Sequence, residues 1–232
     1  GPAGRRGAME PSILSAKSLA SPYWNAHTET MPREALDRLH LGRIQKLVAW
    51  AYARVPFYRR LYDKAGIKPA DIRTLEDFDR HVPVVDKKDL VEAQQSGEPW
   101  GDAAALPEDF NLFRFQTSGS TGVPLAIPVT YYSSHHYGEQ WTYGFWAVGL
   151  RPRDTFYVAF NWGTFAGFWS AYWGVRRLGA TVHSGGGLTT EQRLRQILEW
   201  KPTVLLATPT YALAMAEKAR ELGIDLAASS IR

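Results

Sequence analysis

The chain has 232 residues, 45% of them hydrophobic and 13% aromatic, which is enough for one sizeable core or two small ones. Its formal net charge is only +4, and basic residues are interleaved with acidic ones, so the sequence excludes the basic stripe of a nucleic-acid-binding protein. The absence of cysteine excludes disulfides, thiolate metal sites and cysteine nucleophiles, and it fits a cytoplasmic protein.

The chain begins with small and basic residues over 1–8, where Gly1-Pro2 is typical of a protease-cleavage scar. We therefore expect this segment to be a tag or scar. We expect no signal peptide, since no apolar core follows Met9. No apolar run approaches the roughly 18 residues of a membrane span, so we expect no membrane partner. Residues 9–31 have little periodicity and predict an extended arm.

A long helix is predicted from Pro32, because proline suits a first helical turn and apolar residues then recur at helical spacing. Its apolar face comprises Leu36, Leu39, Ile44, Leu47, Val48 and Ala51. Short helices joined by proline turns follow, one of which starts at Thr74 with Asp77 three residues later. With the turn-rich connector that ends it, the segment 9–111 is expected to form an N-terminal arm and helical region.

A loop rich in hydroxyl groups lies between two apolar runs. The segment 115–128 reads Phe-Gln-Thr-Ser-Gly-Ser-Thr-Gly-Val-Pro-Leu-Ala-Ile-Pro, which predicts a tight turn between two short strands. Glycine lets amide groups approach an anion, and hydroxyls add donors, so a polyphosphate is the natural guest. An ordinary surface loop has the same composition, and the segment is neither a Walker A motif nor a Rossmann fingerprint.

A helix is predicted from Tyr131 to Leu150, where aromatic and apolar residues repeat every three to four positions. His135 and His136 are neighbours within it. Because neighbouring helical residues point in different directions, we favour surface or packing roles for both histidines and expect no metal site.

Strands and helices then alternate to the end of the sequence. Strands are expected over 155–160, 180–183 and 203–207, and helices over 166–178, after 189 and over 209–222. Thr189 and Gln192 match a capping box at one of the helix starts. The alternation predicts an α/β fold for 112–232, with a parallel-rich sheet, helices on its faces and a ligand site beyond the carboxyl ends of the strands.

Two separate segments resemble the adenylate-forming superfamily of acyl-CoA ligases. Residues 117–124, Thr-Ser-Gly-Ser-Thr-Gly-Val-Pro, resemble its phosphate loop, without the lysine that the family commonly carries beside the proline. Between Val55 and Leu90, the runs Val-Pro-Phe-Tyr-Arg, Leu-Glu-Asp-Phe, Val-Pro and Lys-Lys-Asp-Leu look like the N-terminal region of the phenylacetate–CoA ligase branch. The resemblance covers residues 22–231 and implies part of the large N-terminal domain of such an enzyme.

The resemblance also implies binding residues. In the family the loop holds the β- and γ-phosphates of ATP, which here implies Thr117, Ser118, Gly119, Ser120, Thr121 and Gly122. Residues 160–167 resemble the aromatic motif of the acyl pocket, and 207–211 resemble the Thr-Pro-Ser/Thr-Tyr segment of the family. The acid-binding residues implied are Phe160, Trp162, Phe165, Thr208 and Pro209. Considered singly, each fits a core aromatic or a helix cap equally well.

The activity implied is that of an AMP-forming aryl-CoA ligase, with ATP, Mg²⁺ and CoA as cofactor and co-substrates. Its partners would be a carboxylic acid, which the flat rings suggest is aromatic, and the remainder of the ligase chain; a homodimer is left open. No catalytic residue is identified, because the family's Tyr-Gly-x-Thr-Glu segment, ribose-binding aspartate and C-terminal lysine are not visible. The alternatives are a nucleotide- or phosphate-binding fragment without chemistry of its own, or a non-catalytic interaction domain.

Overall fold

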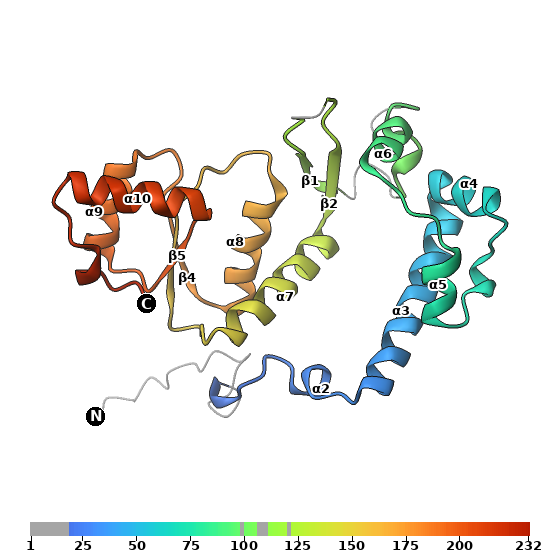
Figure 1. The fold of residues 1–232 in the computed structure, drawn as a ribbon, viewed down its shortest axis with the longest axis horizontal. Helices are drawn as coiled ribbons and strands as arrows, with labels where there is room; N and C mark the ends of the chain where they lie inside the picture. The colour runs from blue at the N-terminus through green and yellow to red at the C-terminus, as the bar shows by residue number, and fades with distance from the viewer. Residues whose placement is uncertain (1–18, 98–99, 106–110, 120–121) are drawn as a thin grey trace, which may run out of the picture.

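The computed structural model describes residues 19–97, 100–105, 111–119 and 122–232. Figure 1 shows an elongated chain with a helical region at one end, a layered α/β region at the other and a β-hairpin between them. The helices are α2 (Ala26–Glu29), α3 (Arg33–Arg54), α4 (Pro56–Lys64), α5 (Leu75–His81), α6 (Lys87–Gln94), α7 (Tyr131–Ala147), α8 (Ala166–Leu178), α9 (Thr190–Trp200) and α10 (Pro209–Glu221). The strands are β1 (Asn111–Gln116), β2 (Ala126–Thr130), β3 (Thr155–Val158), β4 (Thr181–Ser184) and β5 (Val204–Leu206).

The α/β region is built on a parallel sheet with the strand order β4-β3-β5. Successive residues of a strand face opposite sides, and on the central strand Phe156 faces α7 and α8 while Tyr157 faces α9 and α10. Both side chains are fully buried, and burying a side chain of this size contributes about 1.5–3 kcal/mol. The predicted α/β fold with a parallel sheet covered by helices is confirmed, and the strand bounds differ from expectation by one or two residues.

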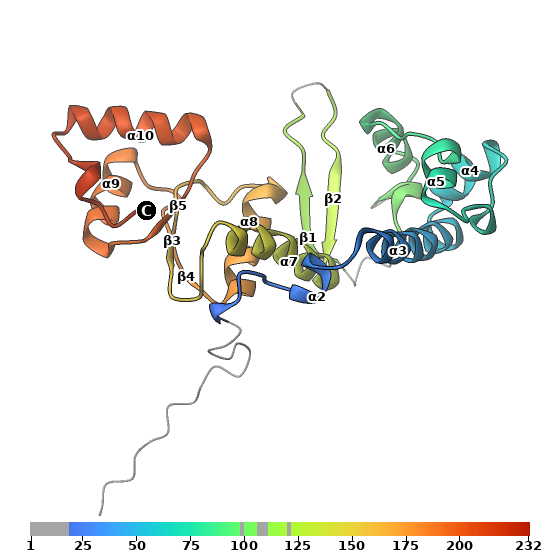
Figure 2. The ribbon, with the colours of Figure 1, turned by 60° about the horizontal axis from the view of Figure 1, so that its bottom comes forward.

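Strands β1 and β2 form the expected hairpin, paired antiparallel with Phe115 opposite Ile127. It packs through Phe115 and Val129 against Trp173 of α8. Figure 2 shows the hairpin standing between α8 and the helical region. The side-chain amide of Gln94, at the end of α6, donates to the carbonyl of Ala126 at 2.7 Å and accepts from its N–H at 3.0 Å. The Gln94 side chain thus joins the end of α6 to β2.

The helical region has its own small core, centred on Val48, Tyr62, Ile67 and Ile72. The predicted helix start at Thr74 is confirmed, since its hydroxyl and the Asp77 carboxylate form a capping box. The placement of Leu47 on the packed face is wrong, because that side chain is 63% exposed. It directly precedes buried Val48, and successive residues of a helix are rotated by about 100°.

The N-terminal arm is described from residue 19 onward and runs along α7. Trp24 donates through its indole N–H to Glu139 at 2.8 Å, and Trp146 donates to the carbonyl of Ser21 at 3.0 Å. The expectation of an extended arm is wrong over α2, a single turn in which the Asn25 side chain accepts from the N–H of Thr28. Among the described residues, no helix is long and apolar enough to cross a membrane.

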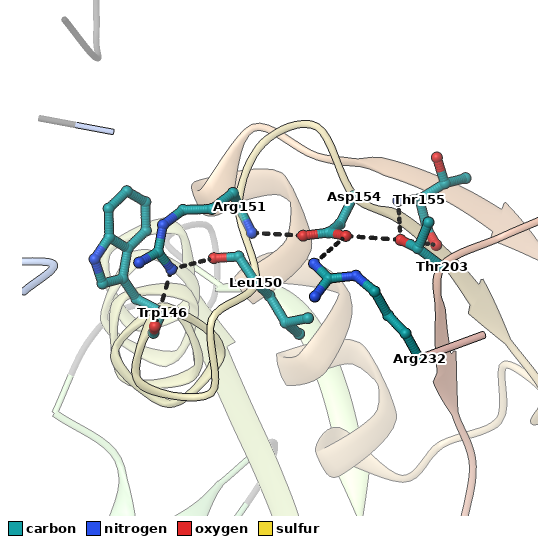
Figure 3. A network of polar contacts seen from close by, with 7 residues as sticks. All are labelled: Trp146, Leu150, Arg151, Asp154, Thr155, Thr203 and Arg232. Atoms are coloured by element: carbon teal, nitrogen blue, oxygen red, sulfur yellow. Dashed lines mark hydrogen bonds and ion pairs between the residues drawn. The ribbon is translucent and has the colours of Figure 1, made fainter. Parts of the chain in front are cut away.

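A buried carboxylate fastens the amino end of the parallel sheet (Figure 3). Asp154 is 2% exposed, and one of its oxygens accepts from the backbone N–H of Arg151 at 2.7 Å. Its other oxygen accepts from the Thr203 hydroxyl and from the Arg232 guanidinium, both at 2.8 Å. The Thr203 hydroxyl in turn accepts from the N–H of Thr155 at 3.0 Å. The starts of β3 and β5 are therefore tied through one side chain.

Arg151 completes this end of the sheet. Its guanidinium lies 3.8 Å from the centre of the Trp146 ring and donates to the carbonyls of Trp146 and Leu150, as Figure 3 shows. Burial by itself raises the pKa of the Asp154 carboxyl. The hydrogen bonds from Arg232, the Arg151 N–H and Thr203 outweigh that effect, so the pKa of Asp154 is lowered.

Replacing Asp154 with alanine should reduce the free energy of unfolding by about 2–3 kcal/mol, because several donors lose a charged acceptor at once. Urea unfolding of the purified protein measures the change. Glu191→Ala is the matched control, since Glu191 forms an exposed ion pair with Arg195 on one face of α9, and it should cost at most about 0.5 kcal/mol. Equal effects of the two substitutions would contradict the role given to Asp154.

The same network predicts a pH dependence. A carboxyl whose pKa is lower in the folded chain than in the unfolded chain stabilises the fold at pH values above the unfolded pKa, for which 3.8 is the ordinary value. This stabilisation is lost as the pH falls through the lowered pKa of the folded chain. The difference in unfolding free energy between wild type and Asp154→Asn should therefore be constant at neutral pH and shrink below pH 3.8. Urea titrations at a series of pH values measure it, and a difference that grows with acid would contradict the sign.

Candidate functional site

The carboxyl ends of β3, β4 and β5 meet at one edge of the sheet, opposite the Asp154 network. Parallel strands of this kind bind ligands at that edge, because the segments that follow them are exposed together. Here those segments are 159–165, 185–189 and 207–209, so the acid-binding residues expected from the sequence all lie in segments at this edge.

The three aromatic residues expected to line an acid pocket are brought into one cluster. Phe160 stacks on Phe168 of α8 with ring centres 4.1 Å apart, and it meets Trp162 edge-on at 5.7 Å. Phe165 is 52% exposed, and its ring centre lies 5.2 Å from that of Phe168. The Trp162 ring also lies 5.0 Å from that of Trp169. Phe168 and Trp169 were not expected at the site, although the aromatic density at the start of this helix was a usable signal.

Thr208 and Pro209 lie exposed at the start of α10. The Thr208 hydroxyl accepts from the N–H of Tyr211 and so caps the helix, which is the structural alternative named for this residue. The Tyr211 hydroxyl is 3.0 Å from that of Thr190 on α9. A role of Thr208 and Pro209 in acid binding stays a prediction.

The expected phosphate loop begins beside the aromatic cluster. The N–H of Gln116, the last residue of β1, donates to the carbonyl of Thr164 at 3.0 Å. The loop and the aromatic segment are thereby hydrogen-bonded neighbours, although almost fifty positions separate them in the sequence.

Two glycines shape this loop. Gly119 and Gly122 have φ values of +69° and +131°, and the N–H of Gly122 donates to the carbonyl of Gly119 at 2.9 Å. A Cβ atom at Gly119 would lie 2.9 Å from Pro124, so a side chain is excluded there on two grounds. The Thr117 hydroxyl accepts from the N–H of Leu125 at 3.0 Å and so helps to close the hairpin.

Six loop residues were expected to bind phosphate, and the structure describes four of them. Ser120 and Thr121 lie outside the described residues. For the others, the structure gives a glycine-shaped turn, and a contact with phosphate stays a prediction.

The glycine segment that follows β4 packs tightly against the site. A Cβ atom at Gly185 would lie 2.7 Å from the Tyr157 hydroxyl, and one at Gly186 would lie 2.8 Å from the Trp162 indole. The Trp162 N–H donates to the Ser184 hydroxyl at 2.7 Å. Burial raises the pKa of Tyr157 to about 12, so its phenol stays protonated and can donate to Gln196 at 2.7 Å. Positions 185 and 186 therefore require glycine, because a Cβ atom at either one would collide with Tyr157 or Trp162.

Arg193, on α9, is the main residue of the site that sequence reasoning missed. Its side chain is buried, and it donates to the carbonyls of Gly185 and Ala159 and to the side chain of Asn161. A signal was present, because Arg193 lies four residues before buried Ile197 and therefore on the same face of the helix.

No cluster of three or more histidine, aspartate or glutamate side chains that could hold a metal ion occurs in the part of the chain that the structure describes. We assign no residues of this part to the Mg²⁺ expected from the family resemblance. His135 is exposed and its ring lies 4.4 Å from that of Tyr131, which agrees with the surface or packing role favoured for it.

Comparisons of sequence and of fold both find similarity to CoA ligases. No family model matches the chain. It is 36% identical over 197 residues to the phenylacetate-coenzyme A ligase of Thermus thermophilus, covering 85% of this chain and 43% of that protein. The Escherichia coli phenylacetate-coenzyme A ligase is 33% identical over 205 residues, which are 88% of this chain and 46% of the enzyme.

Among solved structures, 2-hydroxyisobutyryl-CoA ligase in complex with 2-HIB-AMP and CoA matches with a TM-score of 0.85 and 33% identity, over 91% of this chain and 44% of that one. An open conformation of the same ligase matches with a TM-score of 0.83 and covers 88% and 48% of the two chains. The chain thus spans less than half the length of the relatives it matches. In sequence and in fold, it is a relative of the adenylate-forming CoA ligases of the phenylacetate–CoA ligase type.

Proposed function

We propose that the protein containing this chain is an AMP-forming acid–CoA ligase. The observation that carries the proposal is the identity of 33–36% with two phenylacetate–CoA ligases over at least 85% of the chain. In such a reaction a carboxylate oxygen attacks the α-phosphorus of ATP and pyrophosphate leaves. The CoA thiol then attacks the acyl carbonyl, and AMP leaves with the electron pair of the broken bond.

The phosphate loop would act in the first of these steps. Negative charge builds up on phosphate oxygens, and preorganised donors that already face them stabilise it. We propose that Thr117, Ser118, Gly119, Ser120, Thr121 and Gly122 supply such donors from amides and hydroxyls. Val123 and Leu125 flank Pro124, so the loop would hold the phosphates without a local cation.

We further propose that the acid is aromatic and binds against Phe160, Trp162 and Phe165, with Thr208 and Pro209 across the sheet edge. Flat rings stack on flat substrates, and the cluster already contains stacked and edge-on pairs. The name of the matching structure includes an aliphatic acid, however, so the choice of acid needs direct measurement. CoA as the acceptor and a cytoplasmic location belong to the same proposal.

Acid-dependent exchange of labelled pyrophosphate into ATP tests the activity directly. The full-length protein should catalyse exchange with phenylacetate, benzoate or anthranilate more rapidly than with 2-hydroxyisobutyrate, because the rings favour a flat acid. Faster exchange with the aliphatic acid would contradict the aromatic assignment. Exchange with no acid of the panel would instead favour a nucleotide-binding module that performs no chemistry.

The loop assignment has a test of its own in Gly119→Ala. Positive φ and the contact with Pro124 should distort the turn, so the KM for ATP should rise about tenfold while the KM for the acid stays constant. Steady-state kinetics with each substrate varied in turn measure both values. Gly144→Ala on α7 is the control, since a Cβ atom there meets nothing within 4 Å. A similar rise in both KM values would argue against a phosphate-specific role.

A further inference from the structure

Arg193 carries a positive charge into the interior of the candidate site. Its side chain is 5% exposed, and none of the ion pairs within the described residues includes it. A buried charge without a carboxylate must be satisfied by neutral acceptors, because its loss of hydration is costly. The positions of those acceptors therefore indicate what the residue holds in place.

The acceptors come from the segments that follow two different strands. The Nε atom donates to the carbonyl of Gly185 at 2.8 Å, beyond β4, and Nη1 donates to that of Ala159 at 3.3 Å, beyond β3. The guanidinium carbon lies 5.1 Å from the centre of the Tyr211 ring, which belongs to α10, beyond β5. One side chain thus touches the segments that follow all three strands of the parallel sheet.

Asn161 extends this network to the glycine segment. Its side-chain oxygen accepts from Nη2 of Arg193 at 2.9 Å and also from the N–H of Gly187 at 2.9 Å. The same glycine segment lies against the indole of Trp162, where an added Cβ atom at Gly186 would come within 2.8 Å. The position of the Trp162 ring therefore depends on a segment that Arg193 holds at two points.

We propose that Arg193 is a positioning residue for the acid pocket: it fixes residues 185–187 and Asn161 so that Trp162 presents its ring to the acid. This inference rests on the proposed ligase function for its effect on catalysis. The geometry it describes does not depend on that function. Arg193 acts through other residues and is not given a catalytic role.

The kinetic test compares Arg193→Met and Arg193→Lys with Arg195→Met in the full-length protein. Arg195 lies two positions along α9, is 64% exposed and pairs with Glu191, so Arg195→Met makes the same chemical change at an exposed position. We expect the KM for the acid to rise at least about tenfold in Arg193→Met and less in Arg193→Lys, with the KM for ATP within about threefold of wild type. Arg195→Met should leave both values unchanged. Unchanged kinetics in Arg193→Met, or an equal rise in both KM values, would overturn the proposal.

Hydrogen exchange without substrates separates this inference from the proposed function. Peptides covering 184–188 should exchange faster in Arg193→Met and in Asn161→Ala than in wild type or Arg195→Met. The Gly187 amide donates to the Asn161 side chain, which Asn161→Ala removes and which Arg193→Met no longer holds in place. Asn161 is exposed, so its alanine variant gives the answer even where Arg193→Met fails to fold. Unchanged exchange in Asn161→Ala would overturn the positioning role. Absence of pyrophosphate exchange in wild type would overturn only the ligase function.

Discussion

The parallel pairing of β3 with both β4 and β5 is the constraint on which this structure depends. A strand in that position is buried on both faces, so Phe156 and Tyr157 must each find a separate layer of helices. Parallel pairing also places all three carboxyl ends at one edge. The Asp154 network closes the opposite edge, so one end of the sheet is fastened by buried polar contacts and the other presents the segments of the candidate site.

At the open edge, three features far apart in the sequence become neighbours. The hairpin meets the aromatic segment through the hydrogen bond from Gln116 to Thr164, and the glycine segment meets Trp162 by close packing. Arg193 donates to neutral acceptors in the glycine segment and in the segment that follows β3. Its charge adds a favourable potential for the anionic substrates proposed here, since a buried charge is screened less by water and salt than an exposed one.

The relatives place this arrangement in context. The chain shares 33–36% identity with two phenylacetate–CoA ligases and 33% with a ligase whose name carries a branched hydroxy acid. Proteins named for acids of different shape therefore share sequence and fold with this chain. We expect the residues that follow the strands to decide which acid is bound. Phe160 and Trp162 lie in such a segment and pack against Phe168 and Trp169 of α8, and the proposed acid would bind on this aromatic surface.

The sequence by itself determined the elements whose signals are local. The alternation of strands and helices, the capping box at Thr189 and the glycine-rich turn of the hairpin all depend on residues within a few positions of one another. The sequence did not determine which face of α3 exposes Leu47 or that Arg193 is buried among acceptors 8, 32 and 34 positions away. The exposure of Leu47 depends on how α3 packs in the helical region, and the burial of Arg193 depends on β3 lying between β4 and β5. Only the tertiary structure decides that order, because strand pairing is settled by packing between distant segments rather than by local pattern.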